Sequence, residues 1–181
     1  ENGPYAPVNG AGPEYETLAM LGSLCLVDDL EAVAKANELC NRYGLDTIST
    51  GSVMAFTMEC FEKGLVNRQD LDGVDLKWGN ATAMLEMVKR IGLREGFGRL
   101  LGEGVKRAAE KIGGRAFEAA LHVKGLELPG HDPRAYNSVA VAYATSNRGA
   151  CHLQALSHVF ERSVAMPELG YNEVQDRLGV E

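Results

Sequence analysis

The apolar residues of this 181-residue chain recur mostly at three- and four-residue spacing, which is the period of an amphipathic α-helix. Between Leu30 and Cys40 the apolar positions follow this spacing, and Gly44 comes next, where a glycine commonly ends a helix. Further helices are predicted from Pro13 to Leu26, from Asp46 or Thr47 to Lys63, from Asn80 to Ile91 and from Leu101 to Ile112. Only 121–124 alternates apolar and polar residues as a strand does. We therefore predict an all-α, multihelical fold with at most a short extended segment.

Polar residues mark the expected start of several helices. Asp28 and Glu31 have the spacing of a capping box ahead of the helix that Gly44 ends. Asp132 followed by Pro133 suits the N-cap and first position of a later helix, with an apolar stripe at Tyr136, Val139, Ala140 and Tyr143. These signals predict where helices begin, and their apolar stripes predict which faces are buried.

A cluster of glycines, Gly92, Gly96 and Gly98, interrupts the helical pattern near the middle of the chain. We interpret it as the joint between two helical subdomains, residues 1–96 and 97–181. The chain begins with Glu1 rather than with methionine, which we interpret as processing or excision from a longer protein.

Composition excludes several classes of protein. Hydrophobic residues make up 45% and charged residues 24%, as in ordinary globular proteins. The net charge of -7 argues against a nucleic-acid or anionic-membrane partner, because phosphate binding needs clustered Lys and Arg. No apolar run approaches the roughly 18 residues of a membrane span. Residues 1–7 lack the features of a signal peptide.

The four cysteines, Cys25, Cys40, Cys60 and Cys151, form no C-x-x-C pair and so no local zinc or iron–sulfur ligand set. We expect them to be reduced, buried and structural, since free cysteine behaves as a small hydrophobic residue. The missing disulfide framework favours a cytoplasmic location.

Three short segments concentrate polar groups that could carry chemistry. Glu14, Tyr15 and Glu16 stand at a helix start, where carboxylates either complement the helix dipole or move protons beside a cleft. The segment 41–47 is either a plain helix hairpin or a helix junction that binds a polar ligand. In the third segment, His122 and Lys124 would lie on one side of an extended strand.

Cys151, His152 and His158 fit no common metal-site spacing, and we interpret these residues as structural.

Four blocks of this sequence, in matching order, resemble the tungsten-containing aldehyde:ferredoxin oxidoreductase family. They are GPEYETLAMLGS, ELCNRYGLDTISTG, LGEGVKRAAEKIG and HVKGLELPGHDPRA. The resemblance implies that the chain covers the latter part of the family's second domain and the start of its third, both helical. In that family a β-rich domain holds a metal bis-pterin, and the helical domains close over it.

The resemblance also assigns roles to residues. Glu16, after Tyr15, matches the family's active-site carboxylate, and Leu45 and Asp46 match its pterin-contacting G-L-D motif, with Thr47 beside them. That motif usually opens with Asp, but this chain has Asn41, whose amide brings no charge.

His122 and Lys124 match the family's H-x-K pair, with the histidine near the metal and the lysine toward pterin. The implied catalytic residues are therefore Glu16 and His122. The implied cofactor-binding residues are Tyr15, Asn41, Leu45, Asp46, Thr47 and Lys124. Some members carry an extra metal ligand where this chain has Lys35, whose ammonium is unsuitable, so no metal ligand is expected in this chain.

The implied function is oxidation of aldehydes to carboxylic acids, with ferredoxin as electron acceptor. Its cofactors would be a tungsten (or molybdenum) bis-pterin and a [4Fe–4S] cluster whose ligands lie outside this chain. The isolated chain is not expected to be active, and its partners would include the remaining domains of the parent enzyme and possibly further copies of itself. If the resemblance holds, Glu16 and His122 line one cavity on the order of 10 Å apart or less. The alternatives are a relative acting on another substrate, such as an aromatic acid derivative, or a non-catalytic helical interaction module.

Overall fold

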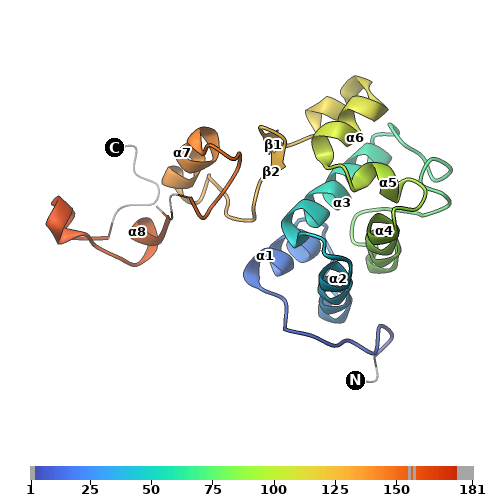
Figure 1. Ribbon diagram of the computed structural model, residues 1–181, viewed down its shortest axis with the longest axis horizontal. Helices are drawn as coiled ribbons and strands as arrows, with labels where there is room; N and C mark the ends of the chain where they lie inside the picture. The colour runs from blue at the N-terminus through green and yellow to red at the C-terminus, as the bar shows by residue number, and fades with distance from the viewer. Residues whose placement is uncertain (1–2, 155, 157, 175–181) are drawn as a thin grey trace. The chain divides into compact units, whose positions relative to one another are not determined.

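The computed structural model describes residues 3–154, 156 and 158–174, and it is mostly helical, with a single two-stranded sheet among these residues (Figure 1). The prediction of an all-α, multihelical fold with at most a short extended segment is therefore confirmed. Contacts divide the chain into two compact units, Glu1–Leu121 and His122–Glu181. The first runs from blue to yellow in Figure 1 and the second from orange-yellow to red.

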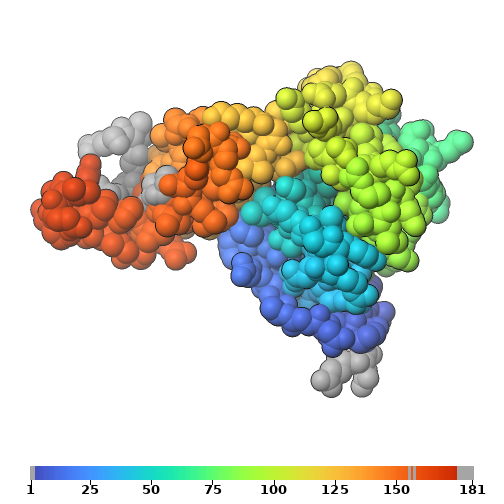
Figure 2. All heavy atoms as spheres, in the orientation of Figure 1, coloured from blue at the N-terminus to red at the C-terminus, as the bar shows by residue number. Residues whose placement is uncertain are grey.

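The first unit contains all of the longer helices. Its elements are α1 (Tyr15–Thr17), the π-helix η1 (Leu18–Ser23), α2 (Leu30–Tyr43), α3 (Thr47–Glu62), α4 (Ala81–Leu93), α5 (Gly98–Leu101), α6 (Val105–Ile112) and the 3-10 helix η2 (Gly114–Glu118). In the space-filling view of Figure 2, the blue, cyan and green segments of this unit are packed against one another.

Helix α3 lies at the centre of the first unit and contacts η1, α1, α2, α4 and α6. It is apolar on nearly every side, which is why most of its residues are buried. Met54 and Met58 are completely buried in it, and α2 and α4 add Cys40 and Met84 to the same core. This central helix carries Asp46 at its start, so the core fixes where the candidate ligand-binding junction lies.

The helix ends agree with the sequence at three positions. Gly44 has a positive φ of 67° and ends α2, Asp46 caps α3, and Asn80 caps α4 through a hydrogen bond from the Ala83 amide. The capping-box prediction at Asp28 was wrong, because Asp29 accepts the hydrogen bond from the Ala32 amide instead.

The first predicted helix also differs in the structure. It begins at Tyr15, two residues after Pro13, and passes into the π-helix η1 instead of continuing as an α-helix to Leu26. Leu26 lies beyond η1 with a positive φ of 56° and a 65% exposed side chain, so this stretch is not buried on all sides.

The predicted glycine joint lies inside the first compact unit. A Cβ at Gly98 would lie only 2.4 Å from the Arg90 carbonyl carbon, so this glycine permits close packing of α5 on α4. The predicted helix 101–112 is instead broken at Gly104, which has a positive φ of 87°. The family-domain boundary at residue 96 stays a prediction, and the end of its second part, 175–181, lies outside the described residues.

The second unit contains β1 (His122–Val123), β2 (Leu126–Glu127), α7 (Asn137–Thr145), α8 (His158–Arg162) and the 3-10 helix η3 (Pro167–Leu169). Strands β1 and β2 form an antiparallel hairpin in which His122 faces Glu127 and Val123 faces Leu126. Its two turn residues, Lys124 and Gly125, both have positive φ, as a tight type I′ hairpin turn requires.

The helix predicted from Asp132 begins later, at Asn137. Asp132 instead closes a turn, in which it accepts hydrogen bonds from the Arg134 amide at 2.8 Å and from the Arg134 guanidinium. Of the predicted apolar stripe, Val139 and Tyr143 are buried as expected, but Ala140 is exposed.

No helix in the described ranges is both long and apolar enough to cross a membrane.

Candidate functional site

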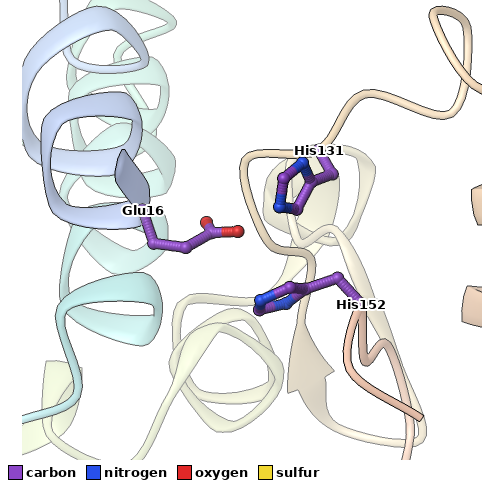
Figure 3. A group of neighbouring side chains, drawn as sticks. All are labelled: Glu16, His131 and His152. Atoms are coloured by element: carbon purple, nitrogen blue, oxygen red, sulfur yellow. The ribbon is translucent and has the colours of Figure 1, made fainter. Parts of the chain in front are cut away.

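Glu16 lies on the short helix α1, which passes directly into η1. The helix has three residues, and its N-cap residue, Glu14, makes no side-chain capping hydrogen bond. Tyr15 is 57% exposed, Glu16 is half-buried and projects from α1 (Figure 3), and Thr17 is buried. Thr17 is therefore the residue through which α1 is fastened to the core.

The segment 41–47 forms a helix junction with exposed polar groups. After Gly44 the chain turns, and the Leu45 amide donates to the Cys40 carbonyl at 2.8 Å. Asp46 Oδ1 then accepts from the Ile48 amide at 2.7 Å and from the Ser49 amide at 3.3 Å. This capping interaction uses one oxygen of a carboxylate that is still exposed to solvent.

The other predicted residues of the junction belong to the same helix–turn–helix segment as Asp46. Asn41 is exposed, and Leu45 and Thr47 are half-buried. An amide, a carboxylate and a hydroxyl at one helix junction offer both donors and acceptors, which fits a polar heterocycle such as a pterin.

The structure brings the Glu16 segment and this junction together. Thr17 Oγ1 donates a hydrogen bond of 3.0 Å to Thr47 Oγ1, although the two residues are 30 positions apart. The packing of α1 on α3 supports this contact. Each threonine directly follows a candidate carboxylate, so Glu16 and Asp46 are presented from adjoining turns of one compact unit.

His122 and Lys124 occupy the hairpin of the second unit. The Nδ1 atom of His122 accepts a hydrogen bond of 3.2 Å from the Gly125 amide. A neutral imidazole that accepts at Nδ1 carries its proton at Nε2, so His122 can donate from that atom. The side chain is half-buried.

Lys124 lies in the turn and not in a strand, which corrects the premise that placed it on the same side as His122. The alternation of side chains holds only for extended backbone, and the positive φ of 57° at Lys124 ends it. Its ammonium donates to the Ser146 carbonyl at 2.9 Å, which joins the hairpin to the end of α7.

A group of three histidines in the second unit was not expected as a site. The rings of His131 and His152 lie near each other (Figure 3). Their centroids are 4.9 Å apart, and the centroid of His131 lies 4.6 Å from that of His158. The Tyr143 hydroxyl donates to the His131 carbonyl at 2.8 Å and so fixes the loop that carries this ring. His152 and His158 had been interpreted as structural because their spacing fits no common metal site.

All four cysteines are free and buried, as the sequence predicted. Burial raises the pKa of the Cys25 thiol to about 12 and the pKa values of Cys40 and Cys60 to about 11. These three groups remain neutral thiols near pH 7, which fits buried structural residues.

Comparison with known proteins places this architecture in a redox family. The whole chain, residues 1–181, matches the family described as aldehyde ferredoxin oxidoreductase, domains 2 and 3. It is 43% identical over 144 residues to the tungsten-containing aldehyde ferredoxin oxidoreductase of Pyrococcus furiosus, a match that covers 79% of this chain and 24% of that protein. The enzyme of the same name from Pyrococcus horikoshii is 40% identical over 83% of this chain and 25% of its own length.

Two further matches have other substrates in their names. The aliphatic sulfonate oxidoreductase, WOR-like subunit, of Pyrococcus furiosus is 31% identical over 93% of this chain and 27% of its own length. Among solved structures, the active site complex BamBC of benzoyl coenzyme A reductase in complex with 1,5 dienoyl-CoA matches with a TM-score of 0.60 and 27% identity. That match covers 74% of this chain and 20% of that one.

The relatives are therefore oxidoreductases, and this chain belongs to the aldehyde ferredoxin oxidoreductase family of tungsten enzymes. The chain spans about a quarter of the length of the curated relatives that it matches.

Proposed function

We propose that this chain forms part of a tungsten-dependent oxidoreductase that converts aldehydes to carboxylic acids and passes the electrons to ferredoxin. The supporting observation is the identity of 40–43% with four relatives named tungsten-containing aldehyde ferredoxin oxidoreductase, each over 79–83% of this chain. A cytoplasmic location and assembly with further copies of the chain belong to the same proposal.

The junction of the first unit would hold one pterin of a tungsten bis-pterin. Asn41, Asp46 and Thr47 supply its hydrogen-bonding groups, and the half-buried Leu45 supplies apolar contact. Tyr15 and Lys124 complete the proposed cofactor-binding set. When bound, the cofactor would supply two-electron redox chemistry, and a [4Fe–4S] cluster with ligands from outside this chain would carry the electrons onward.

The protein groups would manage protons and charge. Aldehyde and water give a carboxylate, three protons and two electrons, so a base is needed close to the reacting carbon. Glu16 takes up a proton as water adds, because its carboxylate is held on α1 and is half-buried. His122 donates a hydrogen bond from Nε2 to the substrate oxygen, a role supported by the Gly125 amide at its Nδ1 atom.

A second candidate is the same redox chemistry on a different substrate. The matches to a sulfonate oxidoreductase and to a benzoyl coenzyme A reductase complex support it. Their identities of 31% and 27% are lower than those of the aldehyde enzymes, which is why the aldehyde is proposed first. Steady-state assays of the complete protein with aldehydes, alkyl sulfonates and aromatic acyl thioesters separate the two candidates.

The role of Glu16 is tested by replacing it in the complete protein that carries this chain. Glu16→Gln should reduce turnover by about 10²-fold or more with tungsten content unchanged, since this is the usual size of a general acid–base contribution. Glu14→Gln is the matched control, because Glu14 is an exposed carboxylate at the same helix start. Equal turnover in both variants would reject Glu16 as the proton acceptor.

The imidazole is tested by comparing His122→Ala with His152→Ala. We expect His122→Ala to lower turnover by about 10²-fold, with tungsten content retained. A histidine of the group around His131 could fill the same role in place of His122. A large loss in His152→Ala together with normal turnover in His122→Ala would transfer the imidazole role to that group.

A further inference from the structure

One set of hydrogen-bonded side chains ties together four segments of the first unit. Thr17 is 3% exposed and Asn37 is 6% exposed, so both polar groups are buried. Thr17 Oγ1 donates to Thr47 Oγ1 at 3.0 Å and also lies 3.4 Å from Asn37 Oδ1. Asn37 Nδ2 donates to the Ala11 carbonyl at 3.1 Å, which extends the network to the loop before α1.

Each side chain of this network is adjacent to a residue of the candidate site or one helical turn from it. Thr17 follows Glu16, and Thr47 follows Asp46. Asn37 lies one helical turn before Asn41, on the same face of α2. The network therefore links the turn that carries the proposed proton acceptor to the proposed pterin junction.

Thr17 is the residue by which α1 reaches the buried interior of the first unit. The helix is three residues long, lacks a side-chain cap, and has Thr17 as its one buried residue. Burying a hydroxyl and an amide is favourable only while their hydrogen bonds are made, so these groups hold one another in place. Loss of one member should release the α1 turn and leave its neighbours unsatisfied.

We propose that Thr17, Asn37 and Thr47 form a positioning network that holds the Glu16 turn in register with the Asp46 junction. The proposal rests on the proposed function for the roles of Glu16 and Asp46. Thr17 and Asn37 touch neither substrate nor cofactor in this scheme and act through their neighbours. A shift of the order of 1 Å in a catalytic group can lower a rate by about 10²-fold, so such a network has a measurable effect.

The kinetic test compares Thr17→Val, which removes the hydroxyl at nearly constant volume, with Thr17→Ser, which keeps it. In the complete protein, Thr17→Val should lower kcat about tenfold or more, with KM and tungsten content nearly unchanged. Thr17→Ser should restore most of kcat. Thr57→Val is the matched control, since Thr57 is a completely buried threonine whose hydroxyl donates to the Val53 carbonyl of its own helix.

The second readout is amide hydrogen exchange, which does not depend on turnover. Thr17→Val should increase amide exchange both in 11–18 and in 45–50. Thr57→Val should leave amide exchange in these two segments unchanged. Unchanged exchange in 45–50 would overturn the network, and so would a kcat of Thr17→Val equal to that of Thr57→Val. If Thr17→Val does not fold, a Thr17→Ser protein that loses kcat with normal tungsten content overturns it instead.

These outcomes differ from failure of the proposed function. A fully active Glu16→Gln protein would reject the role of Glu16, and the exchange data alone would then decide whether the two segments are coupled. Coupled exchange would support the network as a structural link between α1 and the junction, and uncoupled exchange would reject it.

Discussion

At the scale of single residues, helix α2 carries a buried carboxylate. The Glu38 side chain is only 6% exposed, and it pairs with Lys35 at 2.8 Å and with the Arg42 guanidinium. Lys35 also donates to the Pro7 carbonyl at 2.9 Å, so it fastens the N-terminal loop to α2.

Replacing Lys35 should therefore affect stability more than catalysis. Lys35→Met leaves Glu38 buried with one cation in place of two, and we expect the free energy of unfolding to fall by about 1–3 kcal/mol at pH 7. Turnover should change little, because Lys35 is outside the proposed machinery. Lys77→Met is the control, since its ion pair with Asp75 is exposed and such pairs contribute about 0–1 kcal/mol.

The pH dependence of this difference follows from Glu38. Hydrogen bonding from Lys35, and from Arg42, lowers the pKa of the Glu38 carboxyl below its ordinary value, against the opposing effect of burial. A lowered folded-state pKa gives stability that is present above the unfolded-state value, about 4.3, and is lost as pH falls through the folded-state value. Urea unfolding should show the full difference between wild type and Lys35→Met above about pH 5 and a smaller one in acid. A difference that grows in acid would contradict this assignment.

At the scale of elements, the contact between α3 and η1 depends on a missing side chain. A Cβ on Gly51 would lie 2.5 Å from the Met20 carbonyl oxygen and 2.6 Å from the Met20 carbonyl carbon. Both are backbone atoms, so they cannot move aside as the end of a flexible side chain can. Gly51 thus allows the π-helix that follows α1 to pack directly on the central helix.

Gly51→Ala should lower the free energy of unfolding by about 1–3 kcal/mol, the usual cost of overpacking a core. The higher helix propensity of alanine would by itself stabilise the protein by up to about 1 kcal/mol relative to glycine. A net loss of stability would therefore show that the clash with the Met20 backbone dominates. Gly12→Ala is the control, because a Cβ at Gly12 meets no atom within 4 Å. A thermal unfolding midpoint for Gly51→Ala equal to or above that of the wild type would refute this explanation of the contact.

At the scale of the whole molecule, the two compact units have very different cores. The apolar core of the first unit runs from Leu21 to Ala119 and includes members from every longer helix of that unit. The described core cluster of the second unit has three buried residues, Val139, Tyr143 and Ala150. Among the described residues of this unit, so small a core buries little apolar surface to offset the conformational entropy of folding.

We therefore expect residues 1–121 to fold alone and residues 122–181 not to do so. The fragment 1–121 should unfold cooperatively in urea and keep its helical circular dichroism, because its core lies within it. The fragment 122–181 should show neither a cooperative transition nor dispersed amide resonances. Cooperative unfolding of the second fragment by itself would contradict this expectation.

The elements that the sequence predicted well are those with strong local signals. Helices α2, α3 and α4 have regular apolar spacing together with a glycine stop or a capping side chain, and local hydrogen bonds are enough to set these ends. The start of α7 and the π-helix η1 were missed. Asp132 can close a turn as well as cap a helix, and the widened turn of η1 coincides with the close approach of Gly51.

For the candidate site, the sequence by itself determined which groups are available: the carboxylates of Glu16 and Asp46, the amide of Asn41 and the imidazole of His122. It also determined the helix junction that exposes Asp46, because the αL glycine and the N-cap are local features. Only the tertiary structure decided that Thr17 hydrogen-bonds Thr47, that Asn37 reaches the Ala11 carbonyl and that three histidines gather in the second unit. These contacts join positions far apart in the chain, and they form only when packing around α3 and within the second unit brings those positions together.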